Sequence, residues 1–329
     1  MKITRSYQIV FGLITFLFLQ VVSATLSLAQ YPDRPIKFIV PFAPGGGTDL
    51  VARTMGASIA EELRQPVIVE NKPGGSTVVG TDALAKSPPD GYTFVIATFA
   101  HAVNPSLKEK LPYAQDKDFA PVTLVGVSPN VLVVAANSPH KSFKELLAAA
   151  KSKPGTLSYA SQGSGTSAHL AGELFSIQTG SKLIHVPYKG AGPALTDVMG
   201  GQVDMMFATA SAVGSLIEAG KLRPLAVTTT TRSTTPLLSN LPTIAESGIP
   251  GYFAASWYGV FAPAGTPTAI VQQVNGSIKK AVQTKVFKDR VESEGLIISA
   301  GSPEDFAKFV KSEEQRWKEV IKKANIKAD

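Results

Sequence analysis

The sequence predicts an α/β protein of two lobes, and three observations support this prediction. Short runs rich in β-branched and other apolar residues alternate with helical stretches, which is typical of parallel sheets covered by helices. Glycine-rich loops follow several of the expected strands. The chain has 329 residues and no cysteine, so its cores alone must stabilise it, and this length is typical of two domains.

The first 29 residues have the composition of a secretory signal peptide. Lys2 and Arg5 form a basic start, an almost wholly apolar run covers residues 9–22, and small residues precede Ala29. We therefore expect cleavage after Ala29 and export of the rest of the chain. The alternative is a retained membrane anchor, but the apolar run is shorter than the ~20 residues that cross a bilayer.

The next part of the chain predicts three strands with two helices between them. Thr48 or Asp49 can cap the first helix, whose apolar face extends to Ile59, and Gly74-Gly75 interrupts the chain before the second helix. The expected strands are residues 36–40, 66–69 and 92–97, and the second helix is expected over residues 78–85.

A similar pattern restarts at Asn130 and continues to the C-terminus. The expected strands are residues 131–135, 157–160, 184–186, 204–208, 225–228 and 257–261, and the expected helices are residues 142–150, 168–178, 268–284 and 303–324. This organisation predicts a first lobe over residues 30–129, a second lobe over 130–254, and a return of 255–329 to the first lobe. The chain would cross between the lobes near residues 122–130 and 254–261.

Net charge and cysteine content limit the possible partners and chemistry. The net charge of +7 becomes +5 after loss of Lys2 and Arg5, and this mild excess favours an anionic ligand through long-range steering. The basic residues are spread out and are not interleaved with stacking aromatics, so nucleic acid is not an expected partner. The lack of cysteine excludes a thiolate nucleophile, Cys-ligated zinc and a lipidated cysteine.

The loop over residues 41–49 is the most informative local feature. Its glycines let the backbone approach a ligand closely, and the first amides of the following helix have no intrahelical acceptor. Those N–H groups and the positive end of the helix dipole can bind an anion. The loop matches neither the P-loop nor the dinucleotide fingerprint. The alternative is a plain tight turn.

Three more loops of this kind lie between a strand and a helix, at residues 71–76, 161–167 and 188–193. In an open α/β sheet, ligands bind at the carboxyl ends of the strands, where such loops gather. Four loops spread over two lobes favour a ligand in a cleft, held by backbone amides and hydroxyl groups.

No pattern of residues indicates catalysis or a metal site. Ser164 lies in a glycine-rich turn, but Gln162 stands where the G-x-S-x-G motif requires glycine. The histidines are His101, His140, His169 and His185. None of them is placed by the sequence against a serine and an acid, and none forms a His-x-x-x-His pair. We expect His169 and His185 to be packing or hydrogen-bonding residues.

Several aspartates and phenylalanines near the loops could have either a structural role or a role in ligand binding. Asp49 and Asp197 fit helix caps or dipole partners. Asp204 precedes an apolar strand and either supports the structure or orients the loops or a ligand hydroxyl or ammonium group. Phe42 and Phe207, at the ends of expected strands, are candidates for the wall of the cleft.

Several segments together resemble the Bug receptors, which are the solute-binding proteins of tripartite tricarboxylate transporters. The matching segments are residues 31–36, 40–49, 69–74, 89–93, 118–122, 169–175, 185–190 and 262–267. The match runs from Tyr31 nearly to the C-terminus. At Gly75-Ser76-Thr77 the sequence departs from the family, which often has more glycine there.

This resemblance implies a two-lobed type II periplasmic-binding-protein fold with the ligand cleft between the lobes. It also implies a monomer without a cofactor, in the periplasm of a Gram-negative bacterium, that closes over a small carboxylate and delivers it to inner-membrane transporter subunits. In the family the carboxylate is held largely by backbone amides, hydroxyls and water. Carried onto this chain, the ligand-binding residues are Phe42, Pro44, Gly45, Gly46, Gly47, Thr48, Asp49, Ser76, Thr77, Thr98, His101 and Asn104 in the first lobe, and Gln162, Gly163, Ser164, Gly165, Thr166, Ser167, Tyr188, Lys189, Gly190, Ala191, Asp204 and Phe207 in the second.

The identity of the ligand and the downstream partner stay open at this point. Members of the family bind citrate-like acids, short dicarboxylates, acidic amino acids, aromatic carboxylates or nicotinate. An alternative to transport is a sensory role, in which the closed form engages a sensor kinase. A periplasmic enzyme is the third class, for which the sequence supplies no residues.

Overall fold

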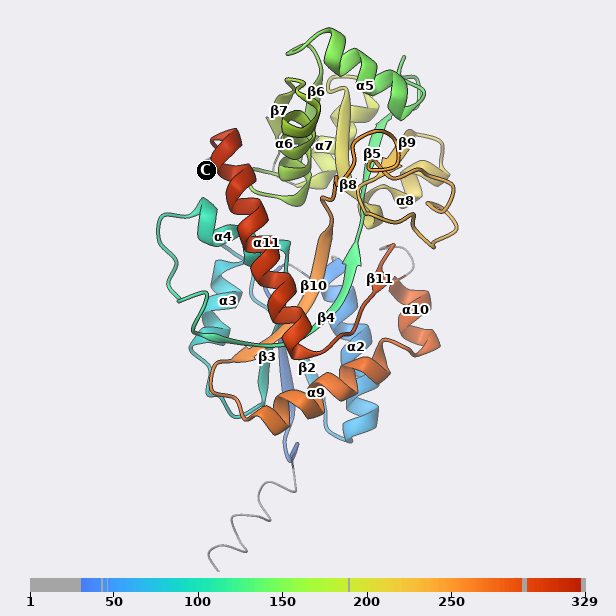
Figure 1. The fold of residues 1–329 in the computed structure, drawn as a ribbon. Helices are drawn as coiled ribbons and strands as arrows, with labels where there is room; N and C mark the ends of the chain where they lie inside the picture. Colours follow the sequence, from blue (N-terminus) through green and yellow to red (C-terminus); the bar gives the residue numbers. More distant parts are fainter. Residues whose placement is uncertain (1–30, 43, 46, 189, 292–294, 327–329) are drawn as a thin grey trace, which may run out of the picture.

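The protein contains two mixed β-sheets, one above the other, and each is covered by helices on both faces (Figure 1). The computed structural model describes residues 31–42, 44–45, 47–188, 190–291 and 295–326. The predicted signal peptide lies outside these residues. The α/β fold class and the two lobes are confirmed, but the sheets are mixed rather than parallel.

The first sheet has six strands and belongs to the lower lobe in Figure 1. Its strands, in spatial order, are β11 (Ile297–Ile298), β4 (Phe119–Ser128), β10 (Ser256–Pro263), β3 (Thr93–Thr98), β1 (Ile36–Val40) and β2 (Val67–Asn71). Helices α2 (Gly47–Leu63), α9 (Thr268–Ala281) and α10 (Lys285–Val291) share a core with one face, and α3 (Val78–Ala85), α4 (Phe99–Leu107) and α11 (Pro303–Ala324) contribute to the core on the other. Successive residues Phe38 and Ile39 point into these two cores, as expected for a strand buried on both faces.

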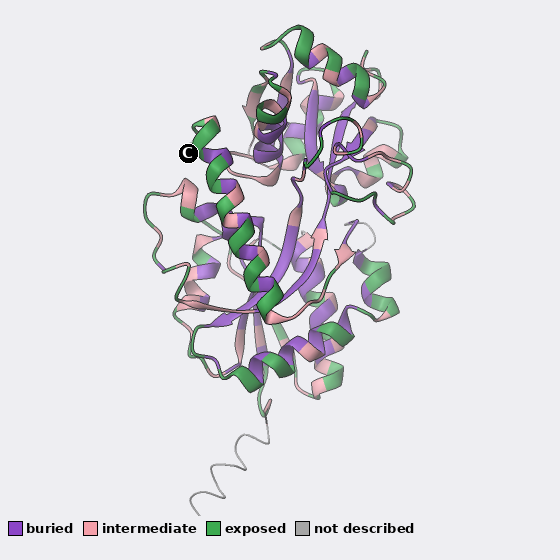
Figure 2. Ribbon diagram, in the orientation of Figure 1, coloured by how far each residue is buried: buried purple, intermediate pink, exposed green. Residues whose placement is uncertain are grey.

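The second sheet has five strands and forms the upper lobe. Its strands, in spatial order, are β7 (Ile184–Pro187), β6 (Ser158–Ser161), β8 (Met205–Thr209), β5 (Asn130–Ala135) and β9 (Leu222–Val227). Helices α5 (Phe143–Ser152) and α6 (Ser167–Thr179) pack on one face, and α7 (Ala191–Met199) and α8 (Ala210–Glu218) pack on the other. Figure 2 shows the buried strands at the centre of both lobes and the exposed residues on the outer helix surfaces.

Two neighbouring segments connect the sheets. The chain passes from β4 to β5 through Pro129, and it returns after Ala254 into β10, where Ser256 pairs with Ser128. Asn130 is fully buried and joins the two segments, because its Nδ2 donates to the Ala254 carbonyl oxygen at 2.9 Å. Its backbone N–H donates to Thr228 Oγ1 at 2.9 Å. Hydrogen bonds of Asn130 therefore join the two crossing segments.

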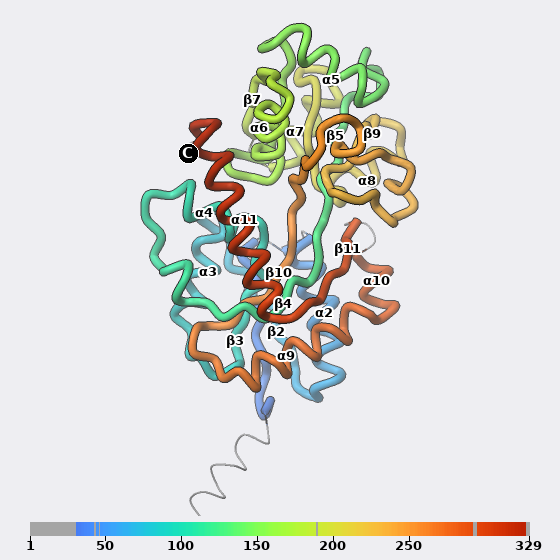
Figure 3. The backbone as a smooth tube through the Cα atoms, viewed as in Figure 1, coloured from blue at the N-terminus to red at the C-terminus, as the bar shows by residue number. Residues whose placement is uncertain are grey.

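Helix α11 spans the boundary between the sheets (Figures 1 and 3). It packs on α4 and β4 of the first lobe and on α6 of the second. Trp317 is fully buried and donates from Nε1 to Glu313 Oε2 at 3.0 Å, while Arg316 donates to the Phe253 carbonyl oxygen beside the second crossing. The last helix therefore contacts both lobes and one of the crossing segments.

The sequence pattern correctly predicted most of the strands but missed the two-residue strand β11 and the long strand β4. This strand contains Pro121 and Gly126, residue types that weaken a strand assignment, although both occur here at irregular pairing with β10. The short helices α4, α8 and α10 were also not predicted. No helix of the described residues is both long and apolar enough to span a bilayer.

We expect the substitution Asn130→Ala to lower the free energy of unfolding by about 1–3 kcal/mol, because it leaves the buried Ala254 carbonyl without its donor. Urea unfolding at pH 7 measures this difference. Ser152→Ala removes an exposed hydroxyl from the end of α5 and serves as the control, with a change within about 0.5 kcal/mol. Equal unfolding midpoints for the two variants would contradict the role of Asn130.

Candidate functional site

The strand directions place the glycine-rich loops at the boundary between the lobes. In the first sheet, β4 ends at the crossing, β10 runs antiparallel to β4, and β3 runs antiparallel to β10 with Thr98 opposite Tyr258. The carboxyl ends of β3 and of the parallel strands β1 and β2 therefore face the boundary. In the second sheet, β5 starts at the crossing with Asn130 opposite Thr209, so β8 and the parallel strands β6 and β7 also end there.

The loop after β6 in the second lobe closely approaches the end of α4 in the first lobe. A Cβ atom added at Gly165, in the loop after β6, would lie 2.4 Å from Cδ1 of Leu107, at the end of α4. Gly165 also has a φ of 77°, which disfavours other residues. A glycine is required at this position both by its backbone conformation and by the close approach of the first lobe.

Asp49 holds the loop between β1 and α2 in place. Its side chain is buried, and Oδ2 accepts hydrogen bonds from the Gly45 N–H and from Arg53 Nε, both at 3.0 Å. Its Oδ1 accepts from Asn71 Nδ2 at 2.9 Å, and the same Nδ2 lies 3.1 Å from the Phe42 carbonyl oxygen. Burial alone would raise the pKa of the Asp49 carboxyl, but these hydrogen bonds and the Arg53 charge lower it to about 2. Asp49 thus orders the loop through interactions within the protein.

The turn before α3 has a strained backbone. Four consecutive residues have positive φ angles, and the last two, Ser76 and Thr77, are not glycines. Asn104 of α4 is buried and donates from Nδ2 to the Ser76 carbonyl oxygen at 2.8 Å and to Thr77 Oγ1 at 3.3 Å. Asn104 therefore supports the conformation of the turn that leads into α3.

The loop between β6 and α6 is closed by hydrogen bonds of its own residues. Thr166 is the N-cap of α6: its Oγ1 accepts from the His169 N–H at 3.4 Å and donates to the Gly163 carbonyl oxygen at 2.7 Å. The Gly165 N–H donates to His169 Nδ1 at 3.0 Å. Ser167 Oγ donates to Asn130 Oδ1 at 3.4 Å, which links the start of α6 to the first crossing segment.

The loop after β7 lies beside the loop after β6. The Tyr188 N–H donates to the Ser161 carbonyl oxygen at 3.0 Å, and the Gly190 N–H donates to the Gln162 carbonyl oxygen at 3.1 Å. The Tyr188 hydroxyl donates to Asp197 Oδ2 at 2.6 Å, and this bond raises the pKa of Tyr188 to about 12. Tyr188 is therefore an oriented neutral phenol.

Asp204 lies at the opposite edge of the second sheet from the loops. Its Oδ2 accepts from the Ser158 N–H at 2.7 Å and from Ser158 Oγ at 2.8 Å, at the amino ends of β8 and β6. Ser158 is three residues from Ser161, a separation of roughly 10 Å along a strand. Asp204 therefore supports the structure by bonding to Ser158, and its prediction as a ligand-binding residue is wrong.

Phe207 and His101 belong to the cores rather than to a cleft surface. Phe207 is fully buried and its ring lies 5.9 Å from Phe175 and 6.3 Å from Tyr159. The His101 ring lies 4.4 Å from that of Phe261, and burial lowers its pKa to about 3. Both predictions failed because the sequence does not show which face of a strand or helix a side chain occupies.

The remaining predicted residues surround the boundary, and their contact with a ligand stays a prediction. They lie at the β1–α2 loop (Phe42, Pro44, Gly45, Gly47, Thr48), at the start of α4 (Thr98), in the β6–α6 loop (Gln162, Gly163, Ser164, Ser167) and at the start of α7 (Gly190, Ala191). Gly46 and Lys189 lie outside the described residues.

Several residues that hold the loops in place were not predicted from the sequence. Arg53 follows Asp49 by four positions, and this spacing is itself a signal for an ion pair on a helix. Asn130 and Ser161 carry no comparable local signal, since only the fold shows that they are buried.

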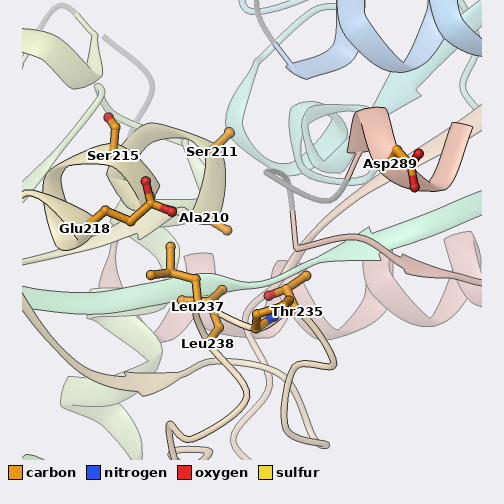
Figure 4. Close-up of a pocket in the computed structure, with 10 residues that line it drawn as sticks. Ala210, Ser211, Ser215, Glu218, Thr235, Leu237, Leu238 and Asp289 are labelled. Carbon is orange, nitrogen blue, oxygen red and sulfur yellow. The ribbon is translucent and has the colours of Figure 1, made fainter. Parts of the chain in front are cut away.

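A cavity of about 530 Å³ also opens between the lobes (Figure 4). It is lined by α8, by residues 235–238 and by Asp289 of α10, and none of the predicted ligand-binding residues contributes to it. In Figure 4 the carboxylates of Glu218 and Asp289 lie on opposite sides. An anionic ligand is disfavoured there, so the loops remain the better candidate site.

The loops offer the chemistry of an anion site. Helices α2, α3, α4, α6 and α7 all begin at the boundary, so their first N–H groups and positive dipole ends face it. Two further hydroxyls belong to this region, because Ser164 lies in the β6–α6 loop and Ser167 is the first residue of α6. No group of three potential metal-ligating side chains occurs among the described residues.

Comparison with known proteins found similarity over most of the chain. Residues 51–326 match the model of the family described as "Tripartite tricarboxylate transporter family receptor". Protein BugT of Bordetella pertussis is 38% identical over 308 residues, which cover 93% of this chain and 94% of BugT.

Solved structures show the same arrangement. The structure titled "R. palustris Rpa4515 with adipate" has a TM-score of 0.80 and 39% identity, covering 91% of this chain and all of that one. The structure of MatC (Rpa3494) from Rhodopseudomonas palustris with bound malate has a TM-score of 0.75 and 31% identity, covering 88% of this chain and all of that one.

We expect Asp49→Asn to lower the free energy of unfolding by about 2 kcal/mol at pH 7, since a pKa of about 2 in the folded state lies below that of an unfolded aspartate. A depressed pKa stabilises the fold above about pH 4, and this contribution is lost as the pH falls toward 2. Urea unfolding of both proteins at pH 7, 5 and 3 should therefore show a difference that shrinks with acid. A difference independent of pH would contradict the ionic role of Asp49.

We also expect Gly165→Ala to be more destabilising than Gly180→Ala, by about 1 kcal/mol. Both glycines have positive φ angles, but only at Gly165 would a Cβ atom meet Leu107, whereas the space around Gly180 is open. Thermal unfolding of the two variants isolates this contact. In a Leu107→Ala background the two substitutions should cost the same, and a persisting difference would show that contact with the first lobe is not its cause.

Proposed function

We propose that this chain, which belongs to the family of tripartite tricarboxylate transporter receptors, binds a small carboxylate between its lobes and delivers it to an inner-membrane transporter. The family match and the similarity to BugT confirm the resemblance to the Bug receptors. The family is one of solute-binding receptors rather than enzymes. The observation that carries the proposal is the meeting of glycine-rich loops and helix N-termini from both lobes at one boundary.

In this proposal the carboxylate contacts backbone N–H groups and hydroxyls of both lobes. The first lobe supplies the loop over residues 42–49, the Ser76-Thr77 turn and Thr98, and the second lobe supplies residues 162–167 and 188–191. Asp49 and Asn104 act by fixing these loops. A carboxylate suits such a site because N–H donors at helix N-termini neutralise it without a fixed arginine.

We infer that residues 30–129 with 255–329 form one moving lobe and residues 130–254 the other. A ligand that touches both sets of loops favours the closed state, because only that state makes all the contacts. The two crossings joined by Asn130 would form the hinge.

The ligand is, in our proposal, a small dicarboxylate or a related acid. The relatives with adipate and with malate support this class, and these two dicarboxylates differ in length and in hydroxyl content. The loops of this chain carry few charged side chains that would distinguish such acids, so selectivity would come from the shape of the cleft and from hydroxyls such as those of Ser76 and Thr77.

The cellular role follows from the family and from the sequence of the first 29 residues. We propose export to the periplasm with cleavage after Ala29, action as a monomer, and docking of the closed form on transporter subunits. Copurification of an inner-membrane permease would support this role, whereas copurification of a sensor kinase would favour the sensory alternative.

We expect the mature chain to bind adipate or malate and not the corresponding uncharged diamides. An acid at about 100 times its dissociation constant should add about 2.7 kcal/mol to the free energy of unfolding and raise the melting temperature by several degrees. Thermal shift followed by calorimetry measures this, with the diamides as length-matched controls. If citrate, aliphatic and aromatic dicarboxylates, acidic amino acids and nicotinate all leave the melting temperature unchanged, the carboxylate proposal is wrong.

A further inference from the structure

Two histidine side chains stack beneath the loop between β6 and α6. The ring centroids of His169, in the first turn of α6, and His185, in β7, lie 3.8 Å apart with 6° between the ring planes. His169 is almost fully buried. His169 is bonded to Gly165 within the loop over residues 162–167, which belongs to the proposed binding site, and His185 is bonded to Ser161 just before that loop.

His169 holds the middle of the loop. The Gly165 N–H donates to His169 Nδ1 at 3.0 Å. A nitrogen of imidazole accepts a hydrogen bond only through its lone pair, so Nδ1 must be unprotonated for this bond to exist. A protonated His169 would place a second N–H opposite that of Gly165. The loop would then lose its acceptor and meet a repelling donor.

His185 holds the start of the same loop through Ser161. His185 Nε2 lies 2.7 Å from Ser161 Oγ, and this hydroxyl also lies 3.2 Å from the Gly163 nitrogen and 3.1 Å from the Gly163 oxygen. The two imidazoles therefore support neighbouring glycines. Because the rings are in contact, protonation of one disfavours protonation of the other.

The charged groups around the stack lie on the far side of His169 from the loop. Glu173 Oε1 lies 3.9 Å from His169 Nε2 and accepts from the Tyr159 hydroxyl at 2.7 Å. Tyr252 donates to the Ala171 carbonyl oxygen of α6, and the Arg316 charge of α11 acts on Tyr252. Glu173 can stabilise a protonated His169 through Nε2, but it cannot restore the acceptor that Gly165 needs at Nδ1.

We propose that His169 is a positioning residue that holds the ligand loop in its binding conformation only while its Nδ1 is unprotonated, so that carboxylate affinity falls as the medium becomes acidic. This inference rests on the proposed function for its ligand, but the supporting bond belongs to the protein itself. The bond is present while the His169 ring is neutral and is lost when Nδ1 takes up a proton in acid.

The variant His169→Asn separates the hydrogen bond from the titration. The Oδ1 atom of asparagine can take the place of Nδ1 and accept from Gly165, but it does not titrate. His140→Asn is the matched control, because His140 lies outside the loop and its supports. The chain has four histidines, and His101 has a pKa of about 3, so it stays neutral over the tested range.

The first test uses the mature protein without ligand. Amide and imidazole nitrogen shifts are followed by NMR from pH 8 to pH 5.5. We expect the Gly165 amide to shift with the same midpoint as the His169 ring in the wild type and in His140→Asn, and to stay constant in His169→Asn. A Gly165 amide that does not follow His169, or that still titrates in His169→Asn, overturns the inference.

The second test measures adipate binding by calorimetry over the same range. Loss of one hydrogen bond of ordinary strength predicts a dissociation constant about fivefold weaker at pH 5.5 than at pH 8 in the wild type. The His169→Asn variant should lack this dependence. Protonation of adipate weakens binding to both proteins equally, so it cancels in the ratio of their dissociation constants. Identical pH profiles for the two proteins overturn the inference. If adipate binds at no pH, the proposed ligand is wrong, while the NMR result still decides the role of His169.

Discussion

The pairing of the strands around the two crossings is the constraint on which the rest of the structure depends. Because β4 and β10 run antiparallel and meet β5 at the Asn130 hydrogen bonds, the direction of every other strand relative to the lobe boundary is fixed. The parallel strands of both sheets then end at this boundary, and the helices that follow them begin there. The strand directions thus bring free N–H groups of helix N-termini from both lobes to the boundary between the lobes.

Buried polar side chains then hold the loops in shape. Asp49, Asn104 and His169 each lie in a helix that starts at the boundary, and each bonds to backbone of the adjoining loop or turn. The loops themselves consist mainly of small residues, which leaves their backbone accessible. Such buried networks stabilise one conformation when every member is bonded, so the supports matter as much as the groups that face a ligand. The Ser76-Thr77 turn is an example, since its positive φ angles occur together with the Asn104 hydrogen bonds.

Much of this arrangement could be predicted from the sequence. Apolar periodicity identified most strands, and the four glycine-rich loops were correctly placed at strand ends, because both signals are local. The strand β4 was missed because Pro121 and Gly126 interrupt its pattern. Asp204, Phe207 and His101 were assigned to the cleft because sequence does not show to which edge of a sheet, or to which face, a side chain is directed. The support by Asn130 depends on a contact with Ala254, far away in the sequence, which no spacing reveals.

The central claim is that backbone amides of both lobes hold a carboxylate at the boundary between them. The most direct measurement is an NMR map of backbone amide shifts in the mature protein during titration with adipate or malate. We expect the largest changes in residues 42–49, 76–77, 162–167 and 188–191, with contributions from both lobes. Changes confined to one lobe, or centred on the cavity beside Glu218 and Asp289, would contradict it.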